Sequence, residues 1–92
     1  MEDQEEQLVQ QGEMAEVLLD SQAFSTTVNQ LVDASFQHFA NSKPEENEKR
    51  DAAYHHYRAL VDIVATLRQR VEVKDEIVSK LAEDDNNQKE DD

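Results

Sequence analysis

The segment Ser42–Ala82 reads SKPEENEKRDAAYHHYRALVDIVATLRQRVEVKDEIVSKLA and contains the clearest helix start in the chain. Ser42 is a typical N-cap residue, Glu45 is placed to complete a capping box with it, and Pro44 is tolerated in a first helical turn. Beyond this start, apolar residues recur in alternating steps of three and four, namely Ala53, Tyr57, Leu60, Val64, Leu67, Val71, Val78 and Leu81. This heptad stripe predicts one long helix over about residues 45–82.

A second amphipathic segment lies upstream of this start. Its apolar side chains are Phe24, Val28, Leu31, Val32, Phe36 and Phe39. Their spacing predicts a helix over about residues 21–40, with Asp20 or Ser21 as its N-cap. Because the connection to the long helix is short, the two helices should run antiparallel.

The first segment of the chain is a weaker helix candidate. We expect a helix over about residues 3–19, with Gly12 weakening its middle and residues 1–7 frayed. The predicted fold is therefore all-α: an antiparallel helical hairpin with one broken arm packed on one long helix. We expect residues 1–82 to form a single domain.

Most of the negative charge lies at the two ends of the chain. The formal net charge of the 92 residues is −13. Residues 1–20 contain seven acids and no Lys or Arg, residues 83–92 contain six acids and one Lys, and residues 21–82 contain nine acids and eight bases. Since residues 83–92 include no apolar side chain, we expect them to form a disordered acidic tail.

Composition argues against several classes of function. The absence of Cys removes disulfides and thiolate zinc sites, and the single Gly argues against a phosphate-binding loop. The acidic N-terminus does not resemble a signal peptide, and no apolar run is long enough to span a membrane. A strongly acidic chain also repels DNA phosphates, so we expect no direct nucleic-acid binding.

The three histidines, His38, His55 and His56, do not form a recognisable metal-binding pattern. Adjacent residues on a helix point about 100° apart, and the hairpin register places His56 near residue 29 rather than near His38. A two- or three-helix hairpin also offers no obvious pocket for acid–base chemistry. We therefore predict no catalytic residue, no metal ligand and no cofactor.

The apolar pattern predicts both a core and a surface for association. The predicted core residues are Phe24, Val28, Leu31, Phe36, Phe39, Tyr57, Leu60, Val64, Leu67 and Val71. Tyr54 and Val61 lie on one flank of the heptad stripe, and Val73 and Ile77 lie on the other. Because a hairpin cannot cover both flanks, we expect these four residues to contact another subunit or partner.

Lys74 occupies a position of the heptad stripe where an apolar residue is expected. One interpretation is that it sets register or oligomeric state. The other is that its stem packs while its ammonium group reaches Asp75 or a neighbouring acid. Arg68 and Arg70 lie close to it in sequence, and in the hairpin these cations would face the acidic first helix.

Three stretches resemble a known group of proteins: Val17–Phe24 (VLLDSQAF), Ala40–Arg50 (ANSKPEENEKR) and Tyr57–Leu60 (YRAL). They are similar to small acidic helical proteins encoded in the morphogenesis gene clusters of tailed bacteriophages, near portal and capsid genes. The resemblance covers roughly residues 15–75. It implies a structural or assembly component of a phage, located in the virion or the host cytoplasm, that contacts itself or capsid or portal components.

The resulting hypothesis is a non-enzymatic protein that acts by protein–protein contact and self-association. One alternative is an acidic inhibitor that plugs a basic groove or mimics nucleic acid. The nearly balanced charge of residues 21–82 argues against mimicry and leaves the plug open. Another alternative is a bacterial regulatory or adaptor helix pair.

Overall fold

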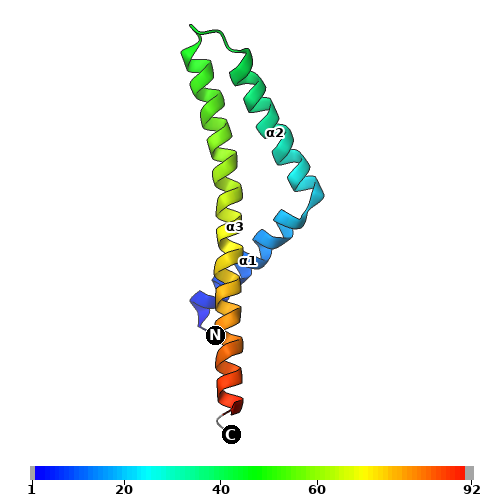
Figure 1. The fold of residues 1–92 in the computed structure, drawn as a ribbon, viewed down its shortest axis with the longest axis vertical. Helices are drawn as coiled ribbons and strands as arrows, with labels where there is room; N and C mark the ends of the chain where they lie inside the picture. Colours follow the sequence, from blue (N-terminus) through cyan, green and yellow to red (C-terminus); the bar gives the residue numbers. More distant parts are fainter. Residues whose placement is uncertain (1, 91–92) are drawn as a thin grey trace. The chain divides into compact units, whose positions relative to one another are not determined.

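The computed structural model describes residues 2–90, and it describes side chains through residue 85. Three helices account for most of this part of the chain: α1 (Asp3–Asp20), α2 (Gln22–Asn41) and α3 (Asn47–Glu90). No strand occurs among residues 2–90. The predicted all-α fold with three helices is confirmed (Figure 1).

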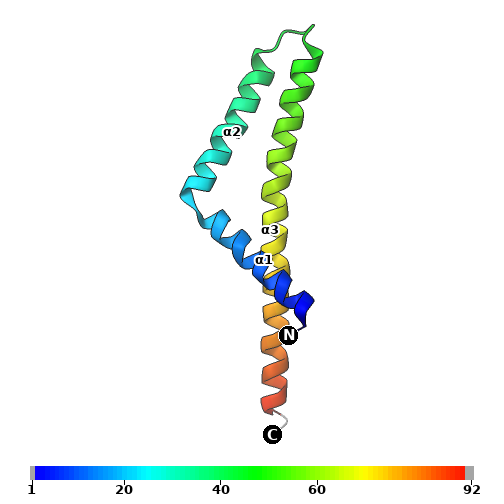
Figure 2. The same cartoon turned by 180° about the vertical axis from the view of Figure 1, so that it is seen from behind.

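The chain forms two compact units, and α3 contributes to both. Unit 1 joins α1, up to Leu18, with the part of α3 from Leu67 onward. Unit 2 runs from Leu19 to Thr66 and contains α2 and the first part of α3, which run in opposite directions (Figures 1 and 2). The expectation that residues 1–82 act as a single domain stays a prediction.

The break between α1 and α2 is made by Ser21. Its backbone is extended (φ −75°, ψ 120°), and its hydroxyl oxygen accepts a hydrogen bond from the Phe24 N–H at 3.2 Å. This is the N-cap geometry that satisfies an otherwise free amide of the first turn. Of the two predicted caps, Asp20 and Ser21, the structure selects Ser21.

The connection between α2 and α3 differs from the predicted capping box. Ser42 ends α2 instead of starting α3, because its hydroxyl and its N–H both donate to the Phe39 carbonyl oxygen, at 2.7 and 3.3 Å. Pro44 is the second residue of a turn closed by a 2.9 Å hydrogen bond from the Glu46 N–H to the Lys43 carbonyl. Since Pro is favoured at that turn position, α3 begins at Asn47 rather than near residue 45.

Both ends of the chain are more helical than expected. Helix α3 continues to Glu90, which corrects the prediction of a disordered tail for residues 83–90; residues 91–92 lie outside the described residues. This stretch contains no Gly or Pro, and a helix already formed adds such residues at little cost. Helix α1 is formed from Asp3, which corrects the fraying predicted for residues 3–7; Met1 lies outside the described residues. Acids in its first turn, Asp3 among them, favour that helix end.

Small residues occupy the seams between helices. In unit 1, Gly12 and Ala15 are the buried residues of α1, and Leu67 is buried on α3. In unit 2, Ser35 and Ala53 are buried on the two facing helices. No large side chain in the described part of the chain is fully buried. Each unit is therefore a two-helix layer in which small residues let the backbones come close.

Candidate functional site

The four side chains predicted to mediate association lie in two different units. Tyr54 is 53% exposed, whereas Val61, Val73 and Ile77 are half-buried. Tyr54 and Val61 belong to unit 2, and the other two belong to unit 1. No single unit therefore contains all four side chains. Tyr54 is the most exposed of them.

The predicted core residues divide into three groups. Leu67 is buried. Half-buried residues are Phe24, Val28, Leu60, Val64 and Val71. Exposed residues, which correct the core prediction, are Leu31, Phe36, Phe39 and Tyr57. They are exposed because two helices meet along one seam only, and large side chains that flank this seam reach past it into solvent.

Several of the exposed rings share one side of unit 2. Phe36 and Phe39 are neighbours on the surface of α2, and Tyr54 and Tyr57 are neighbours on α3, because residues three or four apart share a helix face. The guanidinium carbon of Arg50 lies 5.3 Å from the centre of the Phe39 ring, so the two helix faces adjoin. We define the aromatic face as Phe36, Phe39, Arg50, Tyr54, Tyr57 and Val61.

The other side of the same helix pair contains an open groove of about 1020 Å³. His38 and His56 both line it, and the expectation that His56 lies near residue 29 rather than near His38 stays a prediction. The two histidines each follow a buried seam residue, Ser35 or Ala53, by three positions and so fall on the same side.

The groove does not assemble a recognisable chemical centre. No group of three or more His, Asp or Glu residues in the described part of the chain is placed to hold a metal ion. Within the same part, no side-chain hydrogen bond involves a histidine. The absence of a catalytic residue stays a prediction.

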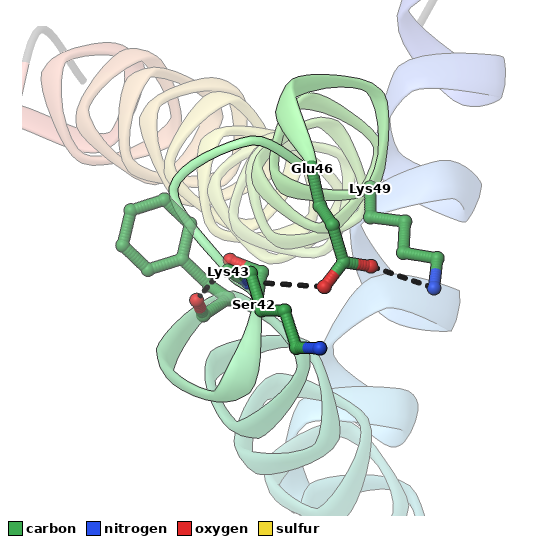
Figure 3. A network of polar contacts seen from close by, with 5 residues as sticks. Ser42, Lys43, Glu46 and Lys49 are labelled. Carbon is green, nitrogen blue, oxygen red and sulfur yellow. Dashed lines mark hydrogen bonds and ion pairs between the residues drawn. The ribbon is translucent and has the colours of Figure 1, made fainter.

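Glu46 lines the groove and is the centre of an ordered polar cluster (Figure 3). Its carboxylate accepts a hydrogen bond from the Lys43 N–H at 3.1 Å and pairs with the Lys49 ammonium at 2.7 Å. The hydrogen bond from Lys49, followed by the one from Lys43, lowers the pKa of Glu46 below its usual value. The same contact with Glu46 raises the pKa of Lys49.

The electrostatic contact of unit 1 is centred on Lys74. Its ammonium pairs with Glu16 of α1 and lies 3.5 Å from Asp75, and its side chain is only 13% exposed. The hydrogen bond to Glu16 raises the pKa of Lys74 above its ordinary value. The stem of Lys74 packs against Gly12, since a Cβ added there would meet it. The interpretation in which the stem packs and the ammonium reaches an acid is therefore confirmed.

Sequence analysis missed the groove and the part played by Arg50 in the aromatic face. A signal for Arg50 was present, because it precedes Tyr54 by four residues and Tyr57 by seven. The groove had no comparable signal, since its position depends on how α2 and α3 meet.

Among the described residues, no helix combines the length and apolar character needed to cross a bilayer. Comparison with known proteins assigns no family: no family model matches the chain, and neither the curated proteins nor the solved structures give a match.

Proposed function

We propose that this chain is a non-enzymatic protein-interaction component that acts through helix packing and self-association. Its resemblance to small acidic proteins of phage morphogenesis clusters supports a place in the virion or its assembly. Capsid or portal components are then the expected partners besides a second copy. The contacts would be made by apolar side chains that neither unit covers.

The exposure of large apolar side chains is the observation that carries this proposal. In the described part of the chain these exposed residues are Leu8, Met14, Val17, Leu18, Leu31, Phe36, Phe39, Tyr54, Tyr57, Ile63 and Val78. The buried hydrophobic residues there are Ala15, Ala53 and Leu67. Large exposed apolar patches mark interaction sites in soluble proteins. A helix pair with such a small buried core also gains most from burying its remaining surface against another chain.

Analytical ultracentrifugation across a wide concentration range tests the self-association. The average mass should rise with concentration. A compact monomer at every concentration would contradict the proposal. Capture from infected cells or virions, followed by mass spectrometry, tests the phage context, with a Tyr54→Glu bait as the matched control.

A second candidate function, an acidic inhibitor that occupies a basic groove, is supported by the distribution of charge. Unit 1 contains fifteen acids and five bases in its sequence, which gives −10 of the total −13. Such a concentration of charge attracts a basic surface and repels its own kind.

Deleting residues 83–92 separates the two candidates. Self-association through apolar side chains should survive the deletion. Binding of the full chain to a basic partner should depend strongly on salt, because salt screens the acidic charges. Deleting these charges should weaken that binding. Unchanged partner binding after the deletion would contradict the inhibitor.

A further inference from the structure

The aromatic face is an apolar surface with a cation inside it. Phe36 is 63% exposed and Tyr54 is 53% exposed. Arg50 is half-buried above the Phe39 ring, and none of the ion pairs in the described part of the chain involves Arg50. A partner that covers this face must bring apolar side chains and should bring a carboxylate.

The outer side of α1 has the complementary character. Val17 (71%) and Met14 (69%) are the most exposed large hydrophobic residues in the described part of the chain. Leu18 lies four positions from Met14, and Glu13 lies four positions from Val17, so both are neighbours of this pair on the helix surface. Residues 1–20 contain no Lys or Arg. We define the outer stripe as Glu13, Met14, Val17 and Leu18.

We propose that the aromatic face of one copy docks the outer stripe of α1 from a second copy. This inference rests on the proposed self-association and names its two surfaces. Within its own unit each surface is exposed, as Met14 and Val17 show on α1 and Phe36 and Tyr54 show on unit 2. In the complex, Glu13 would meet Arg50, and the thioether of Met14 would pack on the aromatic rings, a contact that sulfur and aromatic rings favour.

The two surfaces are different, so the contact is head-to-tail. Such a contact leaves one free surface of each kind at the ends of every assembly, which allows growth into a ring or an open chain. Aromatic side chains bury roughly 150–250 Å² each when fully covered. Four half-exposed rings then offer roughly 300–500 Å², which is less than the ~800 Å² per partner of a standard stable interface. We therefore expect weak, concentration-dependent assembly.

Complementation between two variants of the full chain tests this arrangement. Tyr54→Glu damages the aromatic face and keeps the outer stripe, and Val17→Lys does the reverse. Both changes are at exposed helical positions and place the new charge four residues from an opposite charge, Arg50 or Glu13, so both variants should keep their helices. Ile63→Glu is the matched control, since Ile63 is 51% exposed and lies outside the aromatic face.

Each variant alone should associate at least about tenfold more weakly than the wild type in sedimentation experiments. An equimolar mixture of the two should restore one contact and form a one-to-one dimer, because each variant supplies the surface that the other has lost. Ile63→Glu should assemble like the wild type. Circular dichroism establishes that all variants remain helical.

The other outcomes separate this inference from the proposed function. If the wild type associates and Val17→Lys associates equally well, α1 is not the partner segment, and the inference fails while self-association stands. If both variants are weakened and their mixture stays monomeric, the two surfaces do not meet, and the inference again fails alone. If the wild type is a monomer at every concentration, both fail.

Discussion

Units 1 and 2 each pair a short helix with part of α3, but different contacts hold them together. Unit 1 depends on contact across the helix pair, where Gly12 admits the stem of Lys74 and the Lys74 ammonium reaches Glu16. In unit 2, Ser21 caps α2 and Glu46 orders the connection to α3. Its other side-chain hydrogen bonds among the described residues include those from Arg58 and Thr66 to Asp62, which lie within α3.

The two units also divide charge and apolar surface. Unit 1 carries a sequence charge of −10, whereas unit 2, with seven acids and four bases, carries −3. All five aromatic side chains of the chain lie in unit 2. Electrostatic repulsion between two copies is therefore weaker at unit 2, which holds the aromatic side chains, than at unit 1.

Gly12→Leu should cause the largest loss, and it should act on unit 1. A Cβ at this position would lie 2.7 Å from the Arg70 carbonyl oxygen and would overlap the Lys74 stem. Overpacking of this kind costs about 1–3 kcal/mol, although Leu is the better helix former by roughly 0.8 kcal/mol. Urea unfolding should show the loss, and hydrogen exchange should place it in α1.

Gln11→Leu is the matched control for this change, because it adds the same side chain at an exposed neighbouring position. It should leave the free energy of unfolding nearly unchanged. Equal stability of the Gly12→Leu variant and the wild type would mean that the close approach of α1 to α3 is not required.

Ser21→Ala should act on unit 2 with a smaller effect. Removing an N-cap hydroxyl costs about 1 kcal/mol, because the Phe24 N–H loses its partner. Hydrogen exchange should accelerate in the first turn of α2, and Ser21→Asp should restore protection. Ser25→Ala, an exposed change inside α2, should be neutral or slightly stabilising. A loss of equal size at Ser25 would contradict the capping role.

Local signals predicted the elements of this fold, and they failed where two local structures compete. Ser21 was among the predicted caps because a hydroxyl between two apolar periodic runs is a strong helix start. Pro44 suits both a first helical turn and the second position of a turn, so the start of α3 was misplaced. The extension of α3 to Glu90 was missed because low hydropathy argues against burial, whereas helix propagation does not require burial.

The surface was harder to predict than the helices. Heptad spacing identified Phe36, Phe39 and Tyr57 as facing a partner helix, but spacing does not say how closely the helices approach. Small residues such as Ser35 and Ala53 set that approach, and the large side chains were left at the margin. The position of the aromatic face depends on this packing, because the packing brings Arg50 of α3 next to the Phe39 ring of α2.

Lys74→Met should weaken unit 1 by less than Ser21→Ala weakens unit 2. The substitution keeps the packed stem and removes the ammonium that pairs with Glu16, whose side chain is 48% exposed and partly screened by water. The raised pKa of Lys74 means that its contribution is complete below its ordinary value of 10.5 and is lost as pH rises through the raised value. The difference between wild type and variant should therefore shrink in strongly alkaline buffer. Lys80→Met, at an exposed position of the same helix, is the control.

Glu46→Gln should have the smallest effect and should reveal itself through pH. The pKa of Glu46 is lowered by hydrogen bonds from Lys49 and from the Lys43 N–H, so its contribution is present above its ordinary pKa of 4.5. It is lost as pH falls through the lowered value, because protonation removes the charge that both donors favour. In thermal unfolding experiments, the wild type should therefore lose more stability between neutral pH and about pH 3 than the variant does.

Glu45→Gln should keep the wild-type profile. In the described part of the chain, the carboxylate that makes contacts in this connection is that of Glu46. Identical acid profiles for wild type and Glu46→Gln would show that unit 2 does not depend on this connection, and the contrast with unit 1 would then rest on Ser21 alone.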